Sequence, residues 1–91
     1  MAMEAQANNP LQTQVGGSHY KDLKVQPIEY IHANGLDFIS ANIVKYASRH
    51  KRKNKDEDIK KVIHYALLSL SLDYGYSDED IKSTLKSLAN E

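Results

Sequence analysis

The sequence predicts an all-α protein, a compact bundle of four short helices with a flexible N-terminal arm and an entry loop. Three observations favour this fold class. Apolar residues recur at helical spacing in four segments, residue types suited to helix ends separate these segments, and no alternating strand pattern competes. The chain of 91 residues has room for one domain. We expect a disordered arm over residues 1–14 and a single helical domain over residues 15–91.

The N-terminal quarter predicts an arm, a loop and a first helix. Residues 1–14 are rich in Ala, Gln and Asn and show no periodicity, so they bury too little to offset the entropy of ordering them. The run Gly-Gly-Ser-His-Tyr-Lys at 16–21 is then a loop or a short extended segment. Pro27 suits the first turn of a helix and Gly35 its left-handed end, which predicts a helix over 27–34.

Capping residues delimit three further helices. Asp37 can cap a helix over about 38–53, for which Asn54 offers a left-handed stop. The acidic run 56–58 suits the first turn of a third helix, which Gly75 ends, and Ser77 makes a capping-box-like start for a fourth. The apolar stripes of these three helices are Ile39, Ile43, Tyr46 and Ala47; Ile59, Ile63, Ala66, Leu67 and Leu70; and Ile81, Leu85 and Leu88.

The third helix carries a second apolar set on its far side. Tyr65, Leu68 and Leu72 follow one another at i, i+3 and i+7, so the second half of this helix is apolar all round. A chain of four short helices has little material to surround such a helix. We therefore expect a homo-oligomer in which subunits cover it.

Composition excludes several classes of protein. Without cysteine there is no disulfide framework, no thiolate zinc site and no cysteine nucleophile. No run approaches a membrane span and the start lacks the features of a signal peptide, so we expect a soluble cytoplasmic protein with no membrane partner. The 12 Lys+Arg balance the 12 Asp+Glu, yet residues 45–55 carry six cations and no acid, whereas residues 73–91 carry five acids and two lysines.

Helix 38–53 presents a basic face that suits a phosphate. Asn42, Lys45, Arg49 and Arg52 fall at i, i+3, i+7 and i+10. Arg can hold a phosphate with two hydrogen bonds, Lys adds a point charge, and Asn can contact a base or ribose edge. The structural alternative is a solvated charge run that complements the end of a helix dipole, as we expect for Lys51, Lys53 and Lys55.

The loop at 16–21 is a second candidate phosphate site. Its two glycines leave the backbone unobstructed by side chains, and the loop also offers a hydroxyl, an imidazole, an aromatic ring and a cation. No Walker A spacing is present. The alternative is a flexible entry to the domain with Tyr20 packed on the core.

On the third helix, His64 is either packed, solvated or part of the site. The four His have no metal-ligand spacing, so we predict no metal, and the acidic runs are explained by helix capping.

Several separated motifs give the chain a family resemblance. They are Val15–Lys21, Gln26-Pro-Ile-Glu29, Asn34-Gly-Leu-Asp37, Asn42-Ile-Val-Lys-Tyr-Ala-Ser-Arg49 and Asp58-Ile-Lys-Lys-Val-Ile-His-Tyr65. In this order, over about residues 15–70, they resemble a small domain of tailed bacteriophages. That domain is catalogued as a family of unknown function and is often described as a nucleotide kinase without a P-loop. The resemblance implies a phage origin, an infected host cell as the location, and a nucleotide-sized ligand.

The resemblance also implies which positions form the site. They are Gly17, His19, Tyr20 and Lys21 in the loop, Gln26 and Pro27, then Asn42, Lys45, Tyr46 and Arg49, and finally Lys61, His64 and Tyr65. With the residue chemistry above, the candidate ligand-binding set is Gly17, Ser18, His19, Tyr20, Lys21, Asn42, Lys45, Arg49, Lys61 and His64, with Tyr20 and Tyr46 to stack on a base. The chain ends soon after the fourth helix, whereas kinase members of that family can be longer.

We expect binding of a nucleotide rather than its turnover. Binding asks for cations, an aromatic ring and a few donors, all of which are present. The expected function is an oligomeric phage accessory protein that sequesters a host nucleotide signal or metabolite, with no cofactor. The alternative is a nucleoside monophosphate kinase without a P-loop, which would use magnesium. Nucleic-acid binding through the cations of residues 49–55 and a purely structural interaction module are further alternatives.

Overall fold

The computed structural model describes residues 10–12, 20 and 22–90. Four α-helices dominate it: α1 (Pro27–Asn34), α2 (Phe38–Arg49), α3 (Asp56–Leu72) and α4 (Asp78–Ala89). Two short 3-10 helices accompany them, η2 (Pro10–Gln12) and η3 (His50–Arg52). Over the described ranges the chain forms no strand, which confirms the predicted all-α class. η2 falls within the segment expected to be disordered, and the Gln26 side chain donates a hydrogen bond to its Leu11 carbonyl.

Local capping accounts for most of the helix ends. Gly35 takes φ 59° after α1, and its N–H and that of Leu36 bond back to the last turn, as in a Schellman end. Asp37 caps α2, because its Oδ1 accepts a hydrogen bond of 2.7 Å from the Ser40 N–H. Ser77 and Asp80 form the predicted capping box at the start of α4, with bonds of 2.9 and 3.1 Å. The predicted bounds of α1 are therefore confirmed, as are the starts of α2 and α4.

The connection between α2 and α3 differs from the expectation. α2 ends at Arg49 instead of 53, and the chain tightens into η3. The residue with positive φ is Lys55, not Asn54, at φ 53° and ψ −125°. Its N–H bonds to the His50 carbonyl at 2.7 Å, which closes the end of the turn before α3 begins. As a result, Arg52 lies outside α2 and does not extend the basic face.

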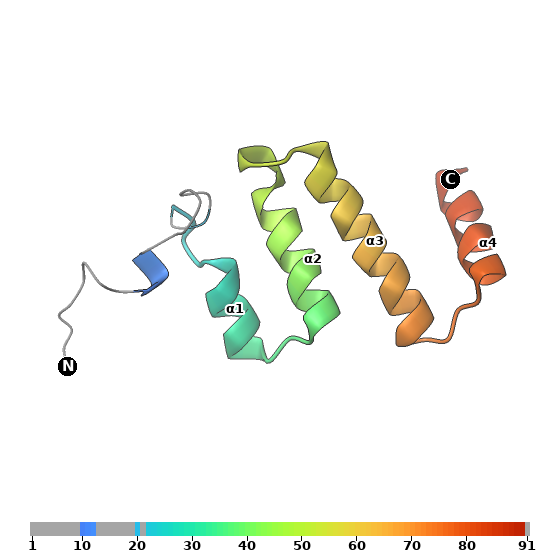
Figure 1. Ribbon diagram of the computed structural model, residues 1–91, viewed down its shortest axis with the longest axis horizontal. Helices are drawn as coiled ribbons and strands as arrows, with labels where there is room; N and C mark the ends of the chain where they lie inside the picture. Colours follow the sequence, from blue (N-terminus) through green and yellow to red (C-terminus); the bar gives the residue numbers. More distant parts are fainter. Residues whose placement is uncertain (1–9, 13–19, 21, 91) are drawn as a thin grey trace.

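The helices lie in a row instead of closing into a bundle (Figure 1). α2 packs along α3, whereas α1 contacts α2 and α4 contacts α3. Among the described helices, no contact joins α1 to α3 or α4, or α2 to α4. Because each helix meets only its neighbours in sequence, no enclosed interior forms, and no apolar side chain of the described residues is fully buried.

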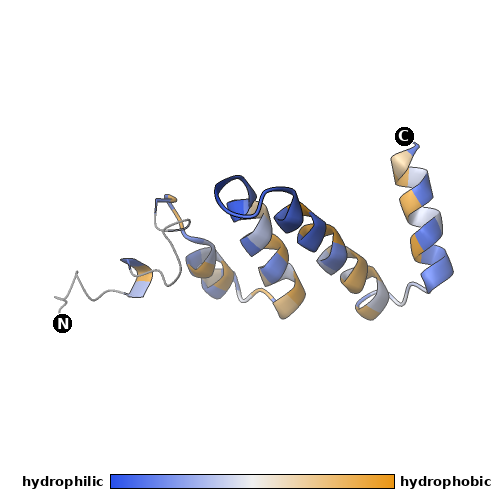
Figure 2. Ribbon diagram, turned by 45° about the horizontal axis from the view of Figure 1, so that its top comes forward, coloured by the Kyte–Doolittle hydropathy of each residue, from blue (hydrophilic) through white to orange (hydrophobic). Residues whose placement is uncertain are grey.

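The two apolar faces of α3 have different surroundings. Tyr65, from the set placed on the far side of α3, contacts the rings of Phe38 and Tyr46 on α2. Ile59 and Ile63, from the main apolar stripe, are exposed. Figure 2 shows the hydrophilic residues concentrated at η3 and the start of α3, with the more apolar part of α3 towards its end. In the part of the chain that the structure describes, no helix is both long and apolar enough to cross a membrane.

Candidate functional site

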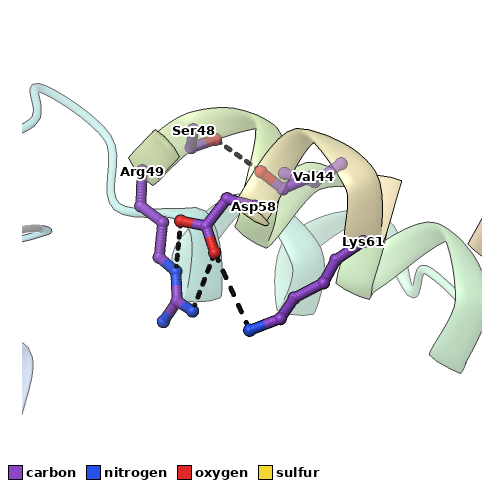
Figure 3. Close-up of polar contacts among 5 residues, drawn as sticks. All are labelled: Val44, Ser48, Arg49, Asp58 and Lys61. Carbon is purple, nitrogen blue, oxygen red and sulfur yellow. Dashed lines mark hydrogen bonds and ion pairs between the residues drawn. The ribbon is translucent and has the colours of Figure 1, made fainter. Parts of the chain in front are cut away.

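A buried ion pair joins α2 to α3. The Arg49 Nε donates to Asp58 Oδ2 at 3.0 Å and its Nη2 donates to Oδ1 at 3.1 Å, so that one edge of the guanidinium holds both carboxylate oxygens. Asp58 is 0% exposed and Arg49 7%. Figure 3 shows the carboxylate between Arg49 and Lys61, whose Nζ lies 3.9 Å from Oδ1. Nearby, the Ser48 hydroxyl donates a hydrogen bond to the Val44 carbonyl, so its proton is already engaged within α2.

The ion pair shifts the ionisation of its members. Burial raises the pKa of the Asp58 carboxyl, but hydrogen bonds and the charge of Arg49 outweigh this effect and bring the pKa below its usual range. Burial likewise lowers the pKa of Arg49, yet its bonds to Asp58 and Tyr20 raise it overall. Burial of the Tyr20 hydroxyl raises the pKa of that phenol despite its interaction with Arg49. All three groups therefore keep their usual neutral-pH charge states.

Three cations surround the ring of Tyr46. Arg49 Cζ lies 4.7 Å from the ring centroid, Lys61 Nζ 4.9 Å and Lys45 Nζ 5.1 Å. Each distance lies within the range of a cation–π contact, in which the electron-rich ring face attracts positive charge. We call Lys45, Tyr46, Arg49, Asp58 and Lys61 the Tyr46 cluster.

A row of aromatic rings continues from the Tyr46 cluster along the α2–α3 contact. Tyr65 stacks on Tyr46 with centroids 6.0 Å apart and ring planes 15° apart. Phe38 and His64 each meet Tyr65 edge-on, at 6.1 and 5.9 Å. Phe38 is 73% exposed and His64 is exposed as well. The row therefore runs from a charged end at Tyr46 to an exposed aromatic end at Phe38.

The Tyr46 cluster has more positive than negative charge. Its three cations face one carboxylate, which Arg49 already neutralises. Within the described part of the chain, no carboxylate lies in ion-pair range of Lys45. Lys45 and Lys61 are half-buried residues, and their ammonium groups are thus the donors that a doubly charged anion would meet.

The structure brings together Lys45, Tyr46, Arg49 and Lys61 of the predicted site, with His64 at the far side of Tyr65. Tyr20 reaches the same cluster through its interaction with Arg49. Asn42 instead donates its side-chain N–H to the Phe38 carbonyl at 2.9 Å, so its amide supports α2. Gly17, Ser18, His19 and Lys21 lie outside the described residues, and so does most of the predicted loop. The described residues contain no group of three His, Cys, Asp or Glu arranged to hold a metal.

Sequence reasoning missed one member of this arrangement and placed another only through the family resemblance. Asp58 was assigned to helix capping, and Tyr65, which the resemblance includes in the site, was placed by periodicity on the far apolar side of the third helix. A signal for both exists, because Asp58, Lys61 and Tyr65 fall at i, i+3 and i+7 and so share one face of α3. That face lies against α2.

Fold and site together define a small all-helical domain with a cation and aromatic cluster between two antiparallel helices. The chain belongs to the family described as "Protein of unknown function (DUF3310)", whose model matches residues 8–67. The match includes α1, α2 and the first two thirds of α3, and therefore the whole Tyr46 cluster. Comparison with curated proteins and with solved structures finds no significant match.

Proposed function

We propose that the protein binds a phosphate-bearing nucleotide at the Tyr46 cluster and holds it without turnover. The observation that carries this proposal is the gathering of three cations within 5.1 Å of one aromatic ring, with one carboxylate among them. Holding three like charges around one ring is unfavourable in the absence of an anion, because the charges repel one another. A phosphate would relieve that repulsion with charge-assisted hydrogen bonds.

The cations have different roles in this proposal. Asp58 occupies one edge of the Arg49 guanidinium, so Arg49 fixes the position of the cluster instead of offering that edge to a phosphate. Lys45 and Lys61 come from different helices and approach the same ring, which gives two ammonium groups for two phosphate oxygens. The phosphate contacts therefore fall to these two lysines.

The aromatic row offers a place for the base. Tyr46 is flanked by Tyr65 and by the cations, so its ring supports the cluster. Phe38 lies two helical turns earlier on α2 and is largely exposed, with His64 on the other side of Tyr65. A base that stacks on Phe38 would leave its phosphates directed towards Lys45 and Lys61, and such stacking contributes about 1–3 kcal/mol per base.

Retention of the ligand agrees with the chemistry of the cluster. Phosphoryl transfer uses carboxylates to place magnesium and a base to orient the acceptor. Asp58 is the carboxylate at the cluster, and it is fully buried against Arg49. In line with the resemblance to phage domains, we propose a host nucleotide as the ligand and its sequestration as the effect.

The test is calorimetric titration of the full chain with adenosine, AMP, ATP, their guanosine counterparts and inorganic phosphate. We expect nucleotides to bind and nucleosides to bind at least tenfold more weakly. Lys45→Ala and Lys61→Ala should each weaken nucleotide binding by about tenfold, the effect of losing one charged hydrogen bond. Lys60→Ala is the matched control, since Lys60 neighbours Lys61 in sequence but pairs with Asp56 and Glu57 on the surface.

Two results would overturn the proposal. One is an equal loss of affinity in Lys60→Ala and Lys61→Ala, which would mean that overall charge and not the cluster attracts the ligand. The other is recovery of a newly phosphorylated product after incubation with mono- and triphosphates, which would establish a kinase. Competition by DNA or RNA with a steep salt dependence, and none by mononucleotides, would assign the cations to nucleic acid instead.

A further inference from the structure

We infer that a second copy of this chain pairs with the first in antiparallel orientation, across the exposed face of α3 and α4. The first observation is the uncovered apolar surface. Ile59 and Ile63 on α3 and Leu85 and Leu88 on α4 are between 37% and 62% exposed. They do not belong to the aromatic contact with α2, and they leave apolar area in water that a neighbouring subunit would cover.

The apolar face of α4 becomes more exposed along the helix. Ile81, Leu85 and Leu88 share this face at i, i+4 and i+7. Ile81 is half-buried, Leu85 is 42% exposed and Leu88 is 62% exposed. α4 thus starts against α3 and leaves its later turns without cover, and in Figure 1 α4 stands apart from the rest of the row. We assign these uncovered turns, together with the exposed Ile59 and Ile63 of α3, to the contact with the second copy.

The second observation identifies the occupant by its charge. Residues 49–61 carry a net charge of +4 and residues 73–80 a net charge of −4. The first segment holds the end of α2, η3 and the start of α3, whereas the second holds the link from α3 to α4 and the first turn of α4 (Figure 1). The 11 residues 62–72 of α3 separate the two segments by about 17 Å. This distance is well beyond the screening length of about 8 Å at physiological salt, so the two ends do not neutralise each other within one chain.

A two-fold axis satisfies both observations with the same chain. Antiparallel copies place the basic end of each against the acidic end of the other, twice, while the apolar faces of α3 and α4 meet between them. A foreign partner would need the same two charges at the same spacing. A second copy carries the same two charged segments at the same spacing because its sequence is identical. The zero net charge of the chain means that pairing adds no overall repulsion.

The experiment uses paired charge reversals in the full chain, measured by sedimentation velocity at low and high salt. Lys51→Glu with Lys53→Glu removes the net charge of the basic end, and Asp78→Lys with Glu79→Lys removes that of the acidic end, so that neither variant keeps two complementary ends. All four side chains are exposed and lie outside the Tyr46 cluster. We expect the unaltered chain to be a dimer that weakens at high salt, each reversed variant to be monomeric, and an equimolar mixture of the two variants to form a dimer.

Recovery on mixing separates a charge effect from misfolding, because a misfolded variant cannot be rescued by its counterpart. A monomeric unaltered chain, dimers that neither reversal dissociates, or a mixture that stays monomeric would each overturn the inference. Ile63→Ser tests the apolar face and should weaken the dimer at least tenfold. Ile28→Ser on α1 removes a similarly exposed side chain outside this face and should leave the dimer intact.

Discussion

Asp58 has the most demanding position of any described side chain. It is fully buried, whereas every described apolar residue retains some contact with solvent. A buried carboxylate is costly unless its charge is paired and its oxygens accept hydrogen bonds, and Arg49 meets both needs. The ion pair therefore fixes how α2 lies against α3 more strictly than the partly exposed apolar contacts do.

Loss of the carboxylate should destabilise the protein strongly. We expect Asp58→Asn to lower the free energy of unfolding by about 3 kcal/mol, because Arg49 would remain buried without a counter-charge. Urea denaturation followed by circular dichroism measures the change. The control is Lys60→Ala, which removes only exposed pairs and should cost less than about 0.5 kcal/mol. Equal losses in both variants would contradict this account.

The same ion pair should make the stability of the folded chain depend on pH in the acidic range. The pKa of Asp58 is lower in the folded chain than in the unfolded chain, so its contribution is complete above the unfolded pKa and is lost as pH falls through the folded pKa. Stability should therefore decline from about pH 5 towards about pH 2. Urea midpoints across this range should fall less steeply for Asp58→Asn than for the unaltered chain. Parallel slopes would show that other carboxyls dominate the acid response.

At the scale of elements, the turn between η3 and α3 stores strain. Lys55 has φ 53° and ψ −125°, a conformation that glycine adopts more readily than residues with a side chain. We expect Lys55→Gly to stabilise the protein by about 1 kcal/mol relative to Lys55→Ala. Both variants lose the Lys55 side-chain bond to the Lys51 carbonyl, so the difference isolates the backbone. A Gly variant that melts below the Ala variant would contradict the assignment.

The helices were predictable because their ends depend on residues close in sequence. Gly35, Asp37 and Ser77 act through bonds within four or five residues, and each took the predicted role. The end of α2 was not predictable in this way. Its position depends on the return of the chain that brings Asp58 to Arg49, a contact across nine residues between two helices. The periodicity of the separate helices carries no such information.

The candidate site was predictable only in part for the same reason. Lys45, Tyr46 and Arg49 share a helix face, and that could be derived from their spacing. Lys61 entered through the family resemblance, and its position beside Tyr46 required the packing of α3 on α2. The role of Arg49 changed most, because spacing alone gave no partner for its guanidinium, whereas the folded chain gives it Asp58.

At the scale of the whole molecule, stability should decrease away from the contact of α2 with α3. These two helices share the ion pair and the stacked rings, whereas α4 contacts α3 alone. We expect backbone amides in α2 and α3 to exchange with solvent most slowly, and those in α4 at least tenfold faster. Hydrogen exchange at high salt, where pairing between copies is weakest, measures this. Equal protection of α4 and α3 under those conditions would contradict it.

The row arrangement also bears on how the chain acquires its structure. Each helix depends only on the helix before or after it, so nearly all tertiary contacts join segments close in sequence. Chains with such local contacts fold in microseconds to milliseconds, since little loop entropy is lost before contacts form. During synthesis, the Arg49 and Asp58 contact requires nothing from α4. The cation cluster can therefore assemble before α4 folds.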